Sequence, residues 1–146
     1  MAGLFCSLKT NGAISVTATT AKTIIQLVAP SGAGVRVTRF HLDPSGASPT
    51  ATKGTWELVK SATGGSGNSS RAPVKSHGHT GSVTATGQQG YTSDPSGGTV
   101  IDSGLVHEQG SINIPREILL NPSETLGLRV TMANSISVAG GFNFEE

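Results

Sequence analysis

The chain has 146 residues, a mass of 14.8 kDa and a formal net charge of +1. This length predicts one domain with a single modest core, and the near-neutral charge excludes the clustered basic stripe typical of nucleic-acid binding. About a quarter of the residues are Ser or Thr, and there are 20 Gly and 7 Pro. This composition favours short strands joined by turns over helices, so we expect an all-β protein built as an antiparallel β-sandwich.

The first residues show no strong hydrophobic period. We therefore predict a flexible N-terminal arm over residues 1–12, followed by a single β-sandwich domain over residues 13–146. The arm carries three large apolar residues, Leu4, Phe5 and Leu8. Because apolar residues on a mobile terminus often order on binding, these three are candidate contacts with a partner protein.

Cys6 is the single cysteine of the chain. One cysteine excludes an intramolecular disulfide and a thiolate metal cluster. Its place in the predicted arm makes its thiol dispensable for stability, with an expected effect of less than about 0.5 kcal/mol for Cys6→Ser. The sequence shows no secretory signal and no apolar run long enough for a membrane span, so we expect synthesis in a reducing cytoplasm and no membrane partner.

Four strands are predicted in the first half of the chain, over residues 13–20, 23–29, 35–42 and 55–61. Ile24 to Val28 form a nearly continuous apolar run, which is typical of a strand covered on both faces. The third strand changes phase midway, and either a β-bulge near Arg39 or burial on both faces would explain the change. In the fourth, Trp56 and Leu58 are expected to point inward.

The middle of the chain is rich in turn residues. We predict a long loop over residues 43–54 and an exposed, mobile Gly/Ser segment over residues 64–70. Residues 72–98 carry only weak strand signals, at Val74 and at residues 83–86. Three further short strands are expected over residues 99–107, 110–114 and 117–120, which gives about eight to ten strands in all.

The last residues, 126–146, show the clearest pattern. Two sets of apolar residues alternate with polar ones and predict two half-buried strands: Leu126, Leu128, Val130 and Met132, then Ile136, Val138, Phe142 and Phe144. Met132 and Ile136 share a face only if an odd number of residues separates them. We therefore predict a β-hairpin closed by the three-residue loop Ala133-Asn134-Ser135.

His77 and His79 are alternate residues on a chain that is expected to be extended, and such a pair can converge on a metal ion. A site needs a further ligand, and Asp94, Asp102 or His107 could supply one only through the tertiary fold. Because the pair lies in a Gly/Ser-rich segment, solvent exposure is the simpler interpretation, and we predict no metal and no other cofactor.

Other polar residues give weaker signals. His41 is expected to be a strand-end residue, and His107 followed by Glu108 suggests a general base without a nucleophile motif beside it. Arg36 and Arg39 either pair across an interface or lie on an exposed sheet face. Trp56 and Tyr91 make a weak platform for a carbohydrate. We therefore expect no enzyme activity, no catalytic residues and no small-molecule substrate.

The order of several segments resembles the small jelly-roll head decoration, or cement, proteins of tailed bacteriophages. The resemblance rests on Ile24-Ile25-Gln26-Leu27-Val28-Ala29-Pro30 leading into Val35-Arg36-Val37-Thr38-Arg39-Phe40, then on Trp56-Glu57-Leu58-Val59, Pro115, Leu126-Gly127-Leu128-Arg129-Val130 and the closing Phe142-Asn143-Phe144-Glu145-Glu146. It covers most of the chain in order and pattern. It implies a jelly-roll-like sandwich that forms a homotrimer and binds the major capsid protein on the outer surface of the assembled virion head.

The resemblance makes Leu4, Phe5 and Leu8 candidate capsid contacts. The apolar run from Ile24 to Val28 also supports an oligomer, since one of its faces would need cover from another subunit. Two other classes stay open. A phage tail-fibre or host-receptor module would grip a glycan with its loops, and a small cupin-like jelly-roll enzyme would need about three His and a carboxylate.

Overall fold

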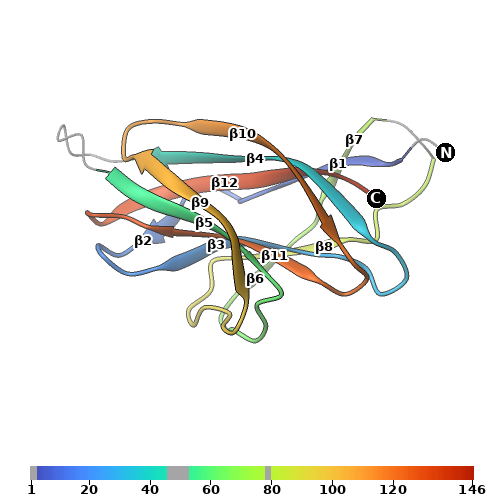
Figure 1. Ribbon diagram of the computed structural model, residues 1–146, viewed down its shortest axis with the longest axis horizontal. Coiled ribbons are helices and arrows are strands. Elements are labelled where there is room, and N and C mark those ends of the chain that lie inside the picture. The colour runs from blue at the N-terminus through green and yellow to red at the C-terminus, as the bar shows by residue number, and fades with distance from the viewer. Residues whose placement is uncertain (1–2, 46–52, 78–79) are drawn as a thin grey trace.

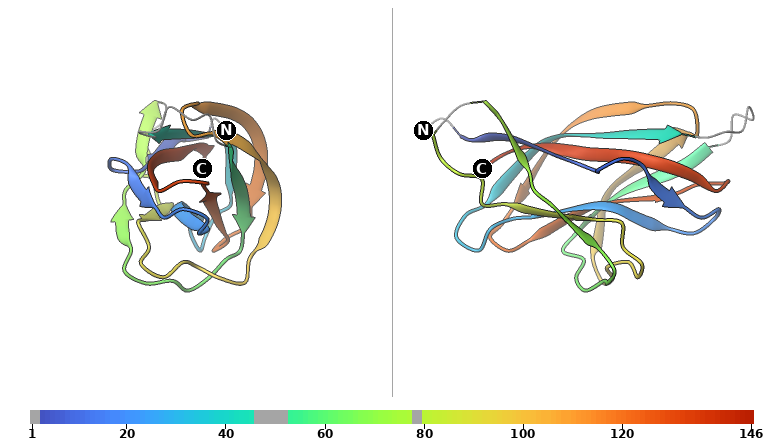
Figure 2. Two further views of the ribbon diagram at one scale, coloured as in Figure 1. Left: turned by 90° about the vertical axis from the view of Figure 1, so that its left-hand side faces the viewer. Right: turned by 180° about the vertical axis from the view of Figure 1, so that it is seen from behind.

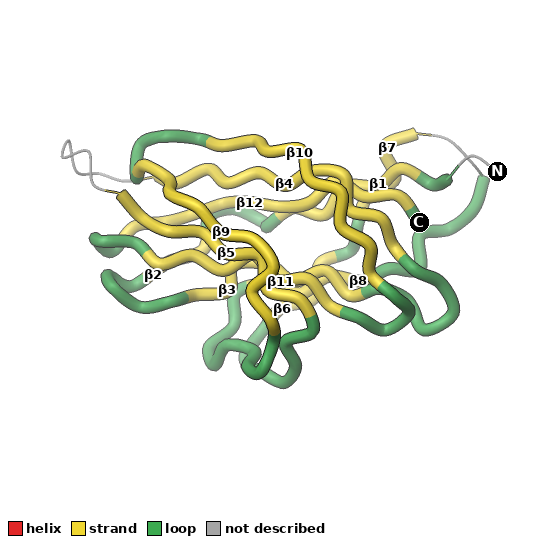
Figure 3. Tube along the Cα trace, viewed as in Figure 1, coloured by secondary structure: helices red, strands yellow, loops and turns green. Residues whose placement is uncertain are grey.

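The computed structural model describes residues 3–45, 53–77 and 80–146, and twelve strands form two antiparallel sheets in these residues (Figures 1 and 3). Sheet A has the order β10-β4-β12-β1-β7, with β2 also paired to β12, and sheet B has the order β6-β8-β3-β11-β5-β9. The strands are β1 Phe5–Lys9, β2 Ile14–Val16, β3 Lys22–Val28, β4 Val35–Ser45, β5 Lys53–Lys60, β6 Ser69–Arg71, β7 Val74–His77, β8 Thr86–Gln89, β9 Thr99–His107, β10 Ile112–Leu120, β11 Thr125–Thr131 and β12 Ile136–Glu145. The all-β prediction is confirmed.

Eight of the strands form a jelly roll. The first pairs with the last, the second with the seventh, the third with the sixth and the fourth with the fifth: β1 with β12, β3 with β11, β4 with β10 and β5 with β9. This nested pairing is that of a long antiparallel ribbon rolled into two facing four-stranded sheets. The predicted jelly-roll-like sandwich is therefore confirmed, and the short strands β2, β6, β7 and β8 extend it.

The core lies between the two sheets, which curl around a common interior in the end-on view of Figure 2. Phe40 and Phe142 of sheet A and Leu58 and Leu128 of sheet B are fully buried there. The rings of Phe40 and Trp56 meet across the interior with centroids 4.7 Å apart and planes tilted by 54°. In the described residues, every buried side-chain N or O atom has a hydrogen-bond partner.

Several predicted strands are confirmed in detail. The apolar run of β3 is buried on both faces from Thr23 to Leu27. The phase change in β4 is a bulge, because Phe144 pairs with Val37 and Asn143 pairs with Arg39, which leaves Thr38 as the extra residue. The strand predicted over residues 99–107 is β9, with the same bounds. Twelve strands replace the expected eight to ten.

The predicted C-terminal hairpin is wrong in its pairing. All eight alternating apolar residues from Leu126 to Phe144 are buried, but β11 pairs with β3 and β5 in sheet B, while β12 pairs with β1, β2 and β4 in sheet A. The segment between Met132 and Ile136 therefore crosses from one sheet to the other. The alternation of apolar and polar residues indicates only that each strand buries one of its faces. Two strands in opposite sheets of a sandwich show this pattern just as two paired strands in one sheet do.

The expected flexible arm is also wrong for the residues that the structure describes. Phe5–Lys9 form β1, which pairs with β12 on one side and β7 on the other. Leu4, Cys6 and Leu8 belong to the core, with exposed fractions of 7%, 2% and 0%. The segment is too short to show a period, since only two residues of the five-residue strand β1, Cys6 and Leu8, face inward.

The loop that contains the Gly/Ser segment, predicted to be exposed and mobile over residues 64–70, packs against the loop at residues 92–96 below sheet B in Figure 1. Thr63 pairs with Ser96, and Ser66 pairs with Ser93, so the Gly/Ser segment is held by backbone hydrogen bonds. These loops cover the outer face of β3: Gln26 donates to the carbonyl of Ala62 at 3.1 Å. The chain itself therefore covers the face of β3 for which cover from another subunit was predicted.

The structure changes the predicted bounds of two further segments. The strands expected over residues 110–114 and 117–120 form one strand, β10, interrupted by a register shift between Pro115 and Ile118. The loop expected over residues 43–54 is shorter, because β4 continues to Ser45 and β5 begins at Lys53. Residues 46–52 lie outside the described residues.

Candidate functional surfaces

The edge strands β9 and β10 border the same side of the sandwich, β9 in sheet B and β10 in sheet A (Figure 1). Together they present four of the exposed large apolar side chains of the described residues: Val100 and Ile101 are 43% and 41% exposed, Leu105 is 62% exposed and Leu119 is 65% exposed. Edge strands of soluble proteins are usually protected by charges, proline or short length. We call this set of four side chains the apolar edge.

A bulge helps to create the apolar edge. Leu58 pairs with Asp102 and Val59 pairs with Val100, so Ile101 is an extra residue in β9. Two adjacent apolar residues, Val100 and Ile101, are exposed as a result. The sequence held a signal for this, because neighbouring apolar residues followed by Asp102 break the alternation of a half-buried strand.

Polar contacts fix β9 and β10 to their neighbours. Arg116 of β10 pairs with Asp102 of β9 at 2.5 Å, and the ammonium of Lys60 donates to the carbonyl of Leu119 at 3.0 Å. Gly104 lies against the indole of Trp56, where a Cβ atom would come within 2.7 Å of the ring. The apolar side chains therefore project from strands held in place by both sheets.

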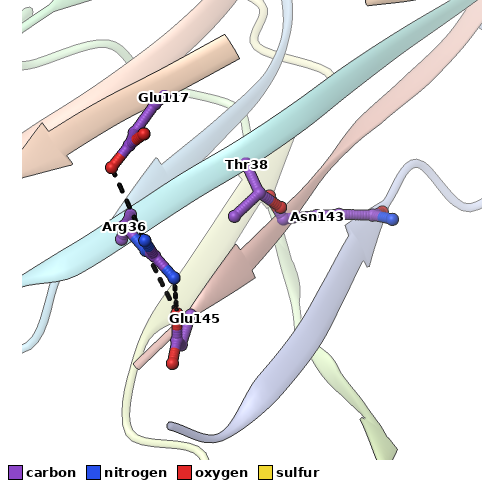
Figure 4. Close-up of polar contacts among 5 residues, drawn as sticks. All are labelled: Arg36, Thr38, Glu117, Asn143 and Glu145. Carbon is purple, nitrogen blue, oxygen red and sulfur yellow. Dashed lines mark hydrogen bonds and ion pairs between the residues drawn. The ribbon is translucent and has the colours of Figure 1, made fainter. Parts of the chain in front are cut away.

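Arg36 forms a ladder of ion pairs across the outer face of sheet A (Figure 4). Its guanidinium binds the carboxylate of Glu145 on β12 and lies 3.5 Å from that of Glu117 on β10. The hydrogen bond to Glu145 is the main cause that raises the pKa of Arg36. Within the described chain, Arg36 thus lies on an exposed sheet face, with both of its ion-pair partners on neighbouring strands of sheet A.

The structure separates the three candidate capsid contacts. Leu4 and Leu8 are core residues, so their expected exposure is wrong, whereas Phe5 on the opposite face of β1 is 37% exposed. Burial also raises the pKa of the Cys6 thiol, and Glu146 adds to this effect. The N-terminal strand thus contributes to the core and presents Phe5 at the surface.

The predicted metal ligands do not converge in the part of the chain that the structure describes. Asp94 accepts a hydrogen bond from the backbone of Thr23 and pairs with Lys22, while Asp102 pairs with Arg116. No group of three or more His, Cys, Asp and Glu suited to a metal ion occurs among the described residues. His79 and the side chain of His77 lie outside them.

Glu108 follows His107 but does not face solvent. Its side chain is fully buried, and its carboxylate accepts hydrogen bonds from the backbone and side-chain amides of Asn134 at 2.9 to 3.2 Å. This contact joins the β9–β10 turn to the connection between β11 and β12. The carboxylate expected as part of a general base therefore has a structural role in the described fold.

Trp56 and Tyr91, considered above as a weak carbohydrate platform, are only 3% and 1% exposed and so do not form one on the described surface. The hydroxyl of Tyr91 lies 2.8 Å from the side-chain oxygen of Gln26 and 2.7 Å from that of Gln88. Burial, with a smaller contribution from Asp94, raises the pKa of Tyr91 to about 12. Tyr91 therefore anchors the loops beneath sheet B instead of stacking on a ligand.

Comparison with known proteins gives no family. No family model matches the chain, and no curated protein matches it. Among solved structures, the chain is similar to Eiger TNF from S. frugiperda, with 12% identity and a TM-score of 0.30 over 97% of this chain and 92% of that chain. The jelly-roll assignment rests on the strand pairings given above. No helix in the described residues is long and apolar enough to span a membrane.

Proposed function

We propose that this chain is a capsid decoration protein of a tailed bacteriophage, a non-enzymatic structural protein that binds the outer surface of the assembled head. The sequence resemblance suggests this class, and the apolar edge is the structural observation that carries the proposal. A small sandwich that holds Leu105 and Leu119 exposed on fixed edge strands is suited to contact other proteins, because covering large apolar side chains with a partner is favourable.

In this proposal the apolar edge joins protomers into a homotrimer, and the trimer binds the major capsid protein. A cyclic trimer uses a heterologous interface, so the edge of one protomer packs against a different surface of the next. A ligand that binds only the assembled shell stabilises that shell by mass action. A trimer can bind the head tightly even if each protomer binds the capsid weakly. Once one protomer is bound, the other two are held near their own sites at a high effective concentration.

The proposal is tested with heads of the phage that encodes the protein, purified without it. The wild-type protein should be a trimer in light scattering and should sediment with the heads to saturation. The double variant Leu105→Ser, Leu119→Ser should be monomeric and should lose most of its binding to heads, because avidity is lost. The matched control is Val74→Ser on β7 at the opposite edge of sheet A, where Val74 is 62% exposed, as Leu105 is.

Two outcomes separate the parts of this proposal. If the wild-type protein does not sediment with heads at micromolar concentration, the decoration function is wrong. If the wild-type protein binds, but the double variant is still a trimer and binds equally well, the function stands and the role of the apolar edge is wrong. Loss of trimers in the Val74→Ser control would show that the interface is not confined to β9 and β10.

A further inference from the structure

The outer face of sheet A contains a polar hollow of about 540 Å³, within the range of small-molecule sites. Strands β1, β4, β10 and β12 line it. Six of its side chains carry charges or carboxamides or can titrate: Lys9, Arg39, His41, Asp43, Asn113 and Asn143. None of these residues belongs to the apolar edge, although β10 contributes to both surfaces.

Strand register explains why this face is hollow. Asn113 pairs with His41, His41 with Gly141, and Gly141 with Lys9, which places four residues in one row across β10, β4, β12 and β1. Gly141 occupies the middle of the row without a side chain. A Cβ atom there would lie 2.9 Å from Cε1 of His41, so the glycine lets the imidazole lie low against the sheet. With strands about 4.8 Å apart, the positions of His41 and Lys9 are about 10 Å apart.

The hollow combines positive charge with hydrogen-bond acceptors. Lys9 and Arg39 are not paired with a carboxylate in the described part of the chain, and Arg39 donates to the side-chain oxygen of Asn113 at 3.1 Å. Asp43 and the carboxamides of Asn113 and Asn143 offer acceptor oxygens. With neutral His41, the four charged or titratable side chains of the hollow carry a net charge of +1, from two cations and one carboxylate.

His41 is half-buried at the base of this hollow. Burial lowers its pKa, with Asp43 acting in the opposite direction and Lys9 adding to the decrease. Arg39 of β4 is a further charged residue of this hollow, while β10 and β12 face His41 with the uncharged residues Asn113 and Gly141. At neutral pH the imidazole is therefore both a donor and an acceptor.

We propose that this hollow binds a sugar acid, a compact molecule with one carboxylate and several hydroxyls. Lys9 and Arg39 bind the carboxylate, and Asp43, Asn113 and Asn143 bind the hydroxyls. The net charge of +1 matches one carboxylate, and the acceptor oxygens match hydroxyl donors that a simple anion lacks. Eight of the eleven lining residues carry polar side chains, which favours a ligand with many polar groups. This inference does not rest on the proposed capsid function.

The test measures binding of D-glucuronate and N-acetylneuraminate to the full-length protein by two-dimensional NMR. We expect saturable binding of at least one of them, with a Kd of about 1 mM and shifts at the amides of Gly140 and Gly141. D-glucose, which lacks the carboxylate, and acetate, which lacks the hydroxyls, should each bind at least about tenfold more weakly. Arg39→Gln should weaken sugar-acid binding at least about tenfold, and Lys9→Gln should weaken it in the same direction.

The matched control is Lys53→Gln, which removes one exposed positive charge from β5 of the other sheet and should change the affinity less than about twofold. Each contrary result overturns the proposal. It is wrong if neither sugar acid binds saturably, or if Arg39→Gln and Lys9→Gln bind as tightly as the wild type. Equal affinity for acetate and glucuronate would show that the hollow is a simple anion site. Equal affinity for glucose and glucuronate would show that Lys9 and Arg39 do not bind the carboxylate.

Discussion

Leu128→Ala tests the two-sheet core most sharply. Leu128 is fully buried on β11 between its partners Ile25 and Leu58, and its Cδ2 lies 3.2 Å from where a Cβ of Gly140 would be, on the opposite sheet. Losing three carbon groups from the core removes about 2.4 kcal/mol of transfer free energy. Because Gly140 has no side chain that could fill the space, a cavity remains, and we expect a total loss of about 3–4 kcal/mol.

Urea unfolding followed by circular dichroism measures this loss, and a thermal scan should show a decrease in Tm of about 10 °C. The control is Arg129→Ala, one residue away. Its side chain is 28% exposed and pairs with Glu57 at 2.7 Å, so its removal should cost less than about 1 kcal/mol. The reasoning fails if the two variants lose equal stability, or if Leu128→Ala costs less than about 1 kcal/mol.

Three further predictions follow from β1 and β4. Cys6→Ser should lower the free energy of unfolding by about 1–3 kcal/mol, because it buries a hydroxyl whose nearest acceptor, the carbonyl of Leu4, is 3.5 Å from the present sulfur atom. An unchanged urea midpoint would contradict this. A chain starting at Gly12 should lose cooperative unfolding in circular dichroism, because β12 loses its partner β1; native-like unfolding would show that β1 is dispensable. The lowered pKa of His41 means that the unfolded chain binds its proton first as pH falls through about 6.5. Lowering the pH from about 7.5 to about 5.5 should therefore reduce the urea midpoint of the wild type more than that of His41→Asn, and an equal reduction in the two proteins would contradict this.

The sequence predicted individual strands better than it predicted their partners. Periodicity reports burial, and it placed Leu126, Leu128, Phe142 and Phe144 in the core, as observed. Pairing depends on contacts far apart in the chain, such as Leu128 with Ile25, which local alternation does not contain. The same limit explains why the predicted C-terminal hairpin is wrong. A connection that crosses between two sheets and a tight turn within one sheet are flanked by the same alternation of apolar and polar residues.

The functional surfaces were harder to predict. The prediction that Leu4 and Leu8 are exposed is wrong, because a strand as short as β1 carries little periodic signal; the structure buries both residues in the core. The apolar edge depends on the bulge at Ile101, and the polar hollow depends on register across four strands around Gly141. Arg39 and His41 were visible in the sequence as polar residues of a strand, but only the fold brings Lys9 and Asn113 beside them.

The central claim is that the protein decorates the outside of an assembled head. Cryo-electron microscopy of heads prepared without the protein and then saturated with it tests this claim most directly. The account predicts additional ordered density at symmetric positions on the outer surface, in threefold groups into which three copies of the jelly roll fit, with β9 and β10 between protomers. Heads that show no additional density after saturation would contradict it.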